Sequence, residues 1–118
     1  MKNLSLLLIA VLMFTLGGCA HASQAQTAVS HPLVIDVRTE AEWKDGHLGG
    51  AVLIPHDRIE QGIVAVAPDK KGRIYLYCRT GRRTGLAFDA LKKAGYEDLV
   101  NLGTMENAAR ELNLPIVK

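Results

Sequence analysis

The residues best suited to chemistry lie in one short stretch around a cysteine. Cys78 is followed by cationic, hydroxyl and glycine residues, in the order Arg79, Thr80, Gly81, Arg82, Arg83 and Thr84. The thiolate form of cysteine is the nucleophile, and a free cysteine with a pKa of about 8.5 is mostly protonated at neutral pH. Nearby guanidinium groups and the positive end of a helix stabilise the thiolate and lower that pKa. The stretch therefore predicts an activated nucleophile that receives a small anion.

Several residues of this loop have a predicted role in binding the anion. We expect the Arg83 guanidinium to act as an anion clamp, because its planar fork can bind an oxyanion through two hydrogen bonds. Gly81 permits a positive φ, which turns the loop amides toward the anion. Thr84 is expected to cap the following helix. Arg82 fits a solvated surface charge as well as it fits a ligand.

The length of the loop distinguishes between chemistries. Four residues separate Cys78 from Arg83, whereas phosphatases built on a cysteine loop have one residue more between the two. The smaller ring disfavours phosphate and arsenate as substrates and suits a single extra atom on the thiol, such as a transferred sulfur. Two alternatives stay open: a binding or sensing module that turns over no donor, and a phosphatase or arsenate reductase on the same scaffold.

Apolar runs and helical spacing alternate after residue 32 and predict the elements that position the loop. The predicted strands are 33–37, 51–54, 73–77 and 99–102, and the predicted helices are 39–44, about 56–66, 84–94 and 104–112. Thr39 and Glu42 form a capping box at the first helix, which Gly46 ends. This alternation indicates a three-layer α/β domain, whose mainly parallel sheet has helices on both faces. Ligands of such domains bind at the carboxyl ends of the strands, where Cys78 falls.

The beginning of the chain has the pattern of an export signal. Residues 4–16 are almost all apolar, too few for a membrane span of about 20 residues but suited to the core of a signal peptide. Lipoprotein-type cleavage before Cys19 would leave that cysteine to carry a lipid, and ordinary cleavage before Ser23 is the alternative. We therefore expect a signal segment at 1–22, a flexible tether at 23–32 and the folded domain at 33–118. The expected location is the periplasm, with attachment to the outer membrane if Cys19 is lipidated.

Export has consequences for the thiol and for the charge of the mature domain. Cys78 becomes the only free thiol, so it cannot be half of an internal disulfide. Loss of Lys2 leaves 13 of the 14 basic side chains beside 12 acidic ones. This near-neutral balance does not indicate nucleic-acid binding or a membrane-binding face.

Two segments together resemble the single-domain rhodanese family of sulfurtransferases. The first comprises residues 36–38, 42–43, 46–51 and 54–55, and the second is the six-residue loop 78–83 followed by Thr84. Arginine directly after the cysteine resembles the members that use thiosulfate. The resemblance spans residues 33–112 and implies a rhodanese-like domain. One departure lies at 103–108, where the family usually has a pair of glycines and a tryptophan, and it predicts altered packing beside the loop.

The resemblance also implies a mechanism of double displacement on Cys78. The thiolate would take the outer sulfur of thiosulfate or a similar small anionic donor, release sulfite and keep the sulfur as a persulfide. Cyanide or a thiol would then accept the sulfur, with no metal and no organic cofactor. The implied substrate-binding set is Arg79, Thr80, Gly81, Arg82 and Arg83.

Four residues of the first segment are predicted to be structural. Asp36 and Arg38 are expected to form a buried or half-buried pair that ties the end of the first strand to a neighbouring loop and so supports the site. We expect His47 to be a turn residue with a satisfied ring rather than a general base. Trp43 is expected to be a core residue.

Overall fold

The computed structural model of the chain describes residues 32–118. The predicted signal segment with Cys19, and all of the predicted tether except Pro32, lie outside these residues. Within the described part, every helix is too short or too polar to cross a membrane.

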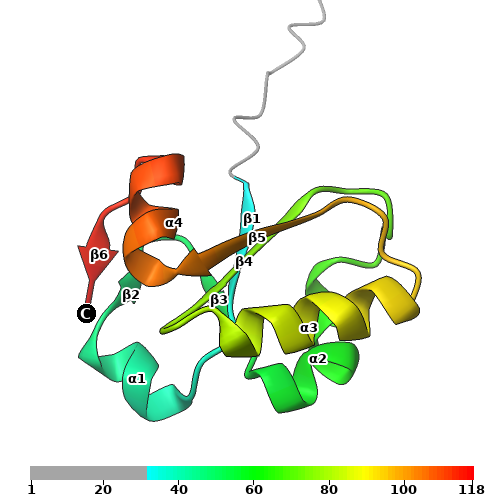
Figure 1. Cartoon of the computed structure of the whole chain (residues 1–118), viewed down its shortest axis with the longest axis horizontal. Coiled ribbons are helices and arrows are strands. Elements are labelled where there is room, and N and C mark those ends of the chain that lie inside the picture. Colours follow the sequence, from blue (N-terminus) through cyan, green and yellow to red (C-terminus); the bar gives the residue numbers. More distant parts are fainter. Residues whose placement is uncertain (1–31) are drawn as a thin grey trace, which may run out of the picture.

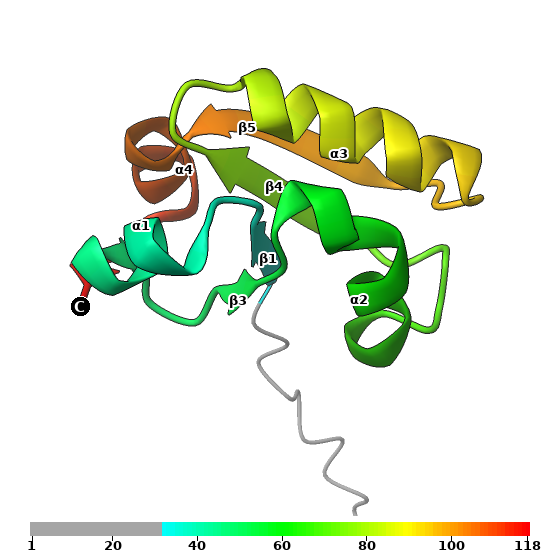
Figure 2. The same cartoon turned by 90° about the horizontal axis from the view of Figure 1, so that it is seen from below.

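The centre of the domain is a four-stranded parallel sheet, made of β1 (Leu33–Asp36), β3 (Val52–Leu53), β4 (Ile74–Cys78) and β5 (Leu99–Thr104) (Figure 1). The strand order is β3-β1-β4-β5, so β1 and β4 are the interior strands. The surrounding helices are α1 (Glu40–Asp45), α2 (Ile59–Val66), α3 (Arg82–Lys93) and α4 (Met105–Leu112). Helices α2 and α3 cover one face, α4 covers the other, and α1 follows β1 (Figure 2). The predicted three-layer α/β fold is confirmed.

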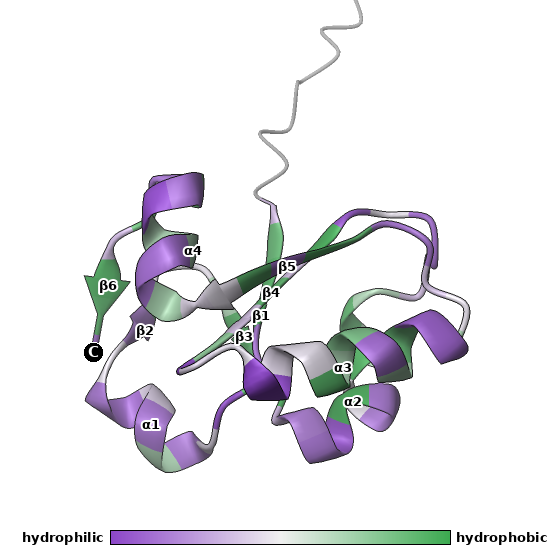
Figure 3. Ribbon diagram, viewed as in Figure 1, coloured by the Kyte–Doolittle hydropathy of each residue, from purple (hydrophilic) through white to green (hydrophobic). Residues whose placement is uncertain are grey.

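The interior strands have apolar side chains on both faces of the sheet. Successive side chains of a strand point to opposite faces, so Ile35 and Leu76 pack with α2 and α3, whereas Val34 and Tyr77 pack with α4. Figure 3 shows these hydrophobic strands between helices whose outer surfaces are largely hydrophilic. Burial on both faces is the reason that the strands appear in the sequence as continuous apolar runs.

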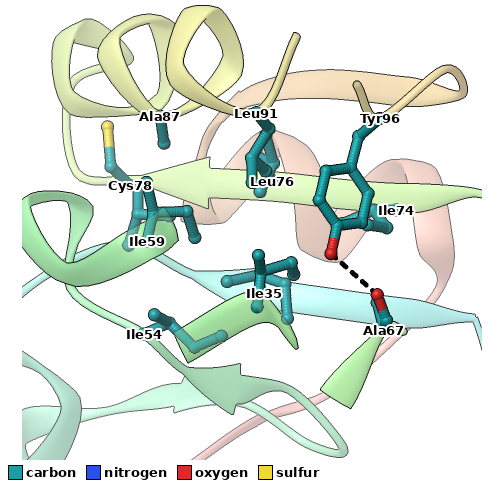
Figure 4. Close-up of a cluster of buried hydrophobic side chains, with 12 residues drawn as sticks. Ile35, Ile54, Ile59, Ala67, Ile74, Leu76, Cys78, Ala87, Leu91 and Tyr96 are labelled. Carbon is teal, nitrogen blue, oxygen red and sulfur yellow. Dashed lines mark hydrogen bonds between the residues drawn. The ribbon is translucent and has the colours of Figure 1, made fainter. Parts of the chain in front are cut away.

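The larger apolar cluster lies under α2 and α3 and contains Cys78 (Figure 4). Ile59 of α2 and Leu91 of α3 belong to it, and the hydroxyl of buried Tyr96 donates a hydrogen bond to the carbonyl oxygen of Ala67 at 2.8 Å. Figure 4 shows the Cys78 sulfur pointing away from the cluster, toward the start of α3. The cysteine is therefore positioned by the larger of the two apolar clusters.

The pairing of β4 with β5 is irregular beside Cys78. Leu76 pairs with Asn101, but Cys78 pairs with Thr104, so β5 has one more residue than β4 over this interval. Such a bulge bends a strand locally and re-aims its side chains. It brings Gly103 and Thr104 beside the cysteine.

The first helix forms as the sequence predicts. The Glu42 amide donates to Thr39 Oγ1 at 3.3 Å, and the Thr39 amide donates to Glu42 Oε2 at 3.1 Å, which completes the capping box. Gly46 follows the end of α1. The helix predicted from about residue 56 begins as a short 3-10 segment, η2 (His56–Arg58), before α2.

The start of α3 differs from the prediction. The helix begins at Arg82, and Gly81 adopts a left-handed conformation with φ 95° at its cap. Because glycine adopts a positive φ without a steric cost, the chain turns into the helix earlier than expected. Thr84 is fully buried within the first turn. The predicted capping role of Thr84 was therefore wrong.

Two features beside α1 differ from the prediction. Trp43 is half-buried rather than a core residue, and it stacks on His47 with ring centroids 3.5 Å apart. The Nδ1 atom of His47 lies 2.9 Å from the carbonyl oxygen of Trp43, so its ring is satisfied as predicted.

A second, antiparallel sheet pairs β2 (His47–Leu48) with β6 (Ile116–Val117). Strands of two residues have no readable periodicity, and the sequence analysis missed both.

Two helical glycines test how closely α2 packs on the sheet. A methyl group at Gly62 would lie 2.6 Å from Cγ2 of buried Ile54, whereas a methyl group at Gly85 would meet nothing within 4 Å. We expect Gly62→Ala to destabilise the domain by about 1–3 kcal/mol through overpacking. Gly85→Ala should stabilise it by about 0.5–1 kcal/mol through helix propensity. Urea unfolding of both variants measures these free energies, and equal stabilisation by the two would contradict the close packing.

Candidate active site

The sulfur of Cys78 lies where β4 ends and α3 begins. The amide of Gly81 donates a hydrogen bond to Sγ at 2.9 Å. Cys78 has no exposed surface, whereas Arg79 and Thr80 are exposed. Since apolar core covers the other side of the cysteine, a donor molecule can reach the sulfur only from the side of this loop.

The loop favours the thiolate form of Cys78. Burial by itself raises the pKa of the thiol, but hydrogen bonds from the hydroxyl and amide of Thr84 and from the amides of Gly81 and Thr80 outweigh burial and lower the pKa below its ordinary value. The donors belong to the loop and to the first turn of α3. The direction of the pKa shift is the one predicted, but its causes are backbone amides and one hydroxyl rather than the neighbouring guanidinium groups.

The Thr84 hydroxyl ties the start of α3 to β5. It donates to the carbonyl oxygen of Gly103 at 3.1 Å, and it is one of the groups that lower the pKa of Cys78. A hydroxyl has only one proton to donate, so a hydrogen bond from Thr84 to the sulfur would replace the bond to Gly103. Thr84 therefore contacts the neighbouring strand through its buried hydroxyl rather than capping the helix.

The arginines of the loop have different partners. Both terminal nitrogens of Arg83 donate to the Glu42 carboxylate, with Nη1–Oε2 at 2.6 Å and Nη2–Oε1 at 2.8 Å. Arg79 and Arg82 are exposed, and neither forms an ion pair within residues 32–118. The two hydrogen bonds that Arg83 was expected to donate to a substrate anion are donated to the Glu42 carboxylate instead.

Glu42 is a site residue for which the sequence predicted only a structural role, in the cap of the first helix. The hydrogen bond from Arg83 is the main cause that lowers its pKa from 4.5 to about 2, and the hydrogen bonds from Thr39 add to that effect against the opposing effect of burial. The carboxylate therefore stays charged at all but strongly acidic pH. The available signal was its place in the first family segment, yet its partner lies 41 residues away.

Asp36 and Arg38 form the predicted structural pair beneath the site. Both are buried, and Arg38 Nη2 donates to Asp36 Oδ2 at 2.7 Å and to the carbonyl oxygen of Gly46 at 2.6 Å. The Tyr77 hydroxyl donates to the same Asp36 oxygen at 2.8 Å and accepts from the Leu48 amide at 3.1 Å. This network connects β1, β4 and the loop after α1, and it satisfies a buried charge pair that would otherwise be costly.

A cavity of about 260 Å³ opens beside the loop, and Arg79 lines it. Glu42, Asp45 and Glu106 place carboxylates on its wall, and Met105 contributes an apolar surface. The segment that departs from the family pattern, 103–108, therefore meets the site at the cavity wall and through Gly103. Within residues 32–118, no cluster of three or more His, Cys, Asp or Glu side chains is arranged to hold a metal ion.

Substitution of Thr84 tests whether its hydroxyl stabilises the thiolate. Thr84→Val keeps the shape of the side chain and removes the donor, so we expect the pKa of Cys78 to rise. Thr84→Ser keeps the hydroxyl and should leave the pKa close to that of the wild type. Ultraviolet absorbance of the thiolate, followed against pH, gives the pKa of each protein. If the valine variant titrates like the wild type, the loop amides alone are responsible for the shift.

Known proteins resemble both the sequence and the fold. A family model described as a rhodanese-like domain matches residues 20–106. The chain is 33% identical over 75 residues to thiosulfate sulfurtransferase PspE of Escherichia coli, across 64% of this chain and 72% of PspE. It is 44% identical over 70 residues to the probable adenylyltransferase/sulfurtransferase MoeZ of Mycobacterium tuberculosis, across 58% of this chain and only 18% of MoeZ.

Solved structures of rhodanese-like domains match the fold of this chain. A structure described as "rhodanese with anions from E. coli" matches with a TM-score of 0.68 and 32% identity, over 74% of this chain and 98% of that one. The Rhodanese_3-like domain of the Alr3790 protein from Anabaena sp. matches with a TM-score of 0.63 and 25% identity, over 74% and 99% of the two chains. The cysteine loop between β4 and α3 lies within the matched family region. The chain therefore belongs to the family of rhodanese-like domains.

Proposed function

We propose that the protein is a thiosulfate sulfurtransferase that carries sulfur on Cys78 as a persulfide. The observation behind this proposal is the buried Cys78 sulfur, which accepts the Gly81 amide at 2.9 Å and has a lowered pKa. Amides that stabilise a thiolate can also stabilise the terminal sulfur anion of a persulfide. PspE is named a thiosulfate sulfurtransferase, and the E. coli rhodanese is described with anions, which supports a small anionic donor.

The proposed reaction has two balanced displacements. The Cys78 thiolate attacks the outer sulfur of thiosulfate, a new S–S bond forms, and the S–S bond of thiosulfate breaks with its electron pair leaving on sulfite. Cyanide or a thiolate then attacks the outer sulfur of the persulfide, which breaks the bond to Cys78 and restores its thiolate. Arg79 lines the cavity beside the loop and is the residue that we expect to contact the donor. This scheme uses neither a metal nor an organic cofactor.

A second candidate is a persulfide-carrying or thiol-sensing module without turnover. The full burial of Cys78 favours it, because an enzyme must bring both a donor and an acceptor to the sulfur in every cycle, whereas a module without turnover needs this access less often. A phosphatase or arsenate reductase is less favoured, because only four residues separate Cys78 from Arg83.

Mass spectrometry after incubation with thiosulfate tests the proposed function. The protein should gain one sulfur atom on Cys78 and release an equal amount of sulfite, and Cys78→Ser should do neither. Addition of cyanide should then remove the sulfur as thiocyanate over many turnovers. Sulfur gain without turnover would identify the carrier module, and hydrolysis of a small aryl phosphate would identify a phosphatase.

We also propose export to the periplasm, with outer-membrane attachment through a lipid on Cys19. The apolar run at 4–16 and the small residues before Cys19 support this proposal. The mature protein isolated from membranes should begin with lipid-modified Cys19, and Cys19→Ser should move it to the soluble fraction. An unmodified N-terminus at Ser23 would contradict the anchor while leaving export intact.

A further inference from the structure

We propose that Glu42 sets the charge of the sulfur donor that the site accepts, by occupying the anion-binding fork of Arg83. The proposal rests on the sulfur-transfer function proposed above and adds a specificity-determining residue to it. It predicts discrimination against donors with two negative charges relative to donors with one.

The pair with Glu42 occupies the end of the Arg83 guanidinium, where its two terminal nitrogens form the fork. Each terminal nitrogen of Arg83 already donates to one oxygen of Glu42, at 2.6 and 2.8 Å. Bidentate pairs of this kind are among the stronger hydrogen-bonded contacts in proteins. An incoming oxyanion would have to displace the carboxylate before it could use this fork.

Glu42 is also held from its other side. Its Oε2 atom accepts hydrogen bonds from the amide and the hydroxyl of Thr39, at 3.1 and 3.0 Å. These bonds belong to the capping box that begins α1. Because the side chain is bound both to its own helix and to Arg83, movement of the carboxylate away from Arg83 would break several contacts at once.

The carboxylate therefore cancels the charge of Arg83 at the site. The pKa of Glu42, about 2, keeps it ionised wherever the Cys78 thiolate exists. Glu42 also lines the cavity beside the loop, together with Asp45 and Glu106. Arg38, which is paired with Asp36, and Arg79 are the cations of this lining. With the charges of Glu42 and Arg83 matched to each other, a donor in this cavity meets Arg79 opposed by Asp45 and Glu106, and each additional negative charge on the donor increases the repulsion from these carboxylates.

The arginine that we expect to bind the donor is not the one that the sequence predicted. Arg79 lines the same cavity, and neither Arg79 nor Arg82 has an ion-pair partner within the described residues. We assign donor binding to Arg79. Arg83 is a positioning residue that joins the first turn of α3 to α1.

Glu42→Gln separates the charge of the side chain from its structural role. Glutamine keeps an acceptor for the Thr39 amide, so the capping box can persist, but the negative charge is lost. We expect the KM for thiosulfate, a dianion, to fall about two- to fivefold relative to the KM for the monoanion methanethiosulfonate. The pKa of Cys78 should also fall, because the Arg83 charge near it is no longer offset. Glu40→Gln, an exposed change on the same helix, should alter neither quantity.

Removal of Arg83 provides a second test that distinguishes this proposal from direct donor binding by Arg83. Arg83→Gln leaves Glu42 unpaired and should raise the KM for thiosulfate more than that for methanethiosulfonate. The double variant Glu42→Gln/Arg83→Gln has the same net charge at the pair as the wild type, so its donor ratio should return toward the wild-type value. If Arg83 itself binds the donor, the double variant will remain as impaired as Arg83→Gln.

The outcomes also separate this proposal from the sulfur-transfer function. An unchanged donor ratio in folded Glu42→Gln, with normal persulfide formation by the wild type, would overturn only the role of Glu42. If the wild type forms no persulfide with either donor, the proposed function falls and this inference falls with it. Thermal unfolding of each variant shows whether the fold is retained.

Discussion

Hydrogen-bond donors that converge on Cys78 are what favours a buried sulfur anion in this domain. A charge without such donors is costly away from water, and Cys78 has no exposed surface. The donors that a buried charge needs are provided where β4 ends. A register shift re-aims the end of the strand, the left-handed Gly81 turns its amide toward the sulfur at 2.9 Å, and α3 begins at the next residue. The apolar cluster behind the cysteine holds the strand in place, so the donors do not need to reorganise when the charge forms.

The ionic groups around this sulfur form closed pairs rather than an open basic patch. Asp36 and Arg38 are buried and hydrogen-bonded to each other, and the Tyr77 hydroxyl completes their network. Nearer the surface, Arg83 is matched to Glu42. The inner pair ties the strands to the loop after α1, and the outer pair ties α1 to α3. Of the three loop arginines, Arg83 is therefore used to join elements, whereas Arg79 and Arg82 have no ion pair within residues 32–118.

The segment 103–108, which was predicted to depart from the family pattern, lies beside the site within a preserved fold. Gly103 adopts a positive φ of 71°, and the Thr104 hydroxyl caps α4 by accepting the Asn107 amide at 3.1 Å. The Gly103 conformation and the Thr104 cap let β5 lead directly into α4. The match to the E. coli rhodanese, with a TM-score of 0.68, shows that the layers are preserved. Met105 and Glu106 of this segment line the cavity beside the loop.

Local patterns in the sequence determined most of the fold. Apolar runs, helical spacing and the Thr39–Glu42 capping box each depend on residues close together in the chain, so the strands, the helices and the position of Cys78 were predictable. The hydrogen-bond and ion-pair partners of the site residues could not be predicted in this way. Arg83 and Glu42 are 41 residues apart, Thr84 and Gly103 are 19 apart, and the paired strands β2 and β6 are too short to show periodicity. A guanidinium near a thiol can bind either a substrate or a neighbouring carboxylate, and only the packing of α1 against the start of α3 decided between them.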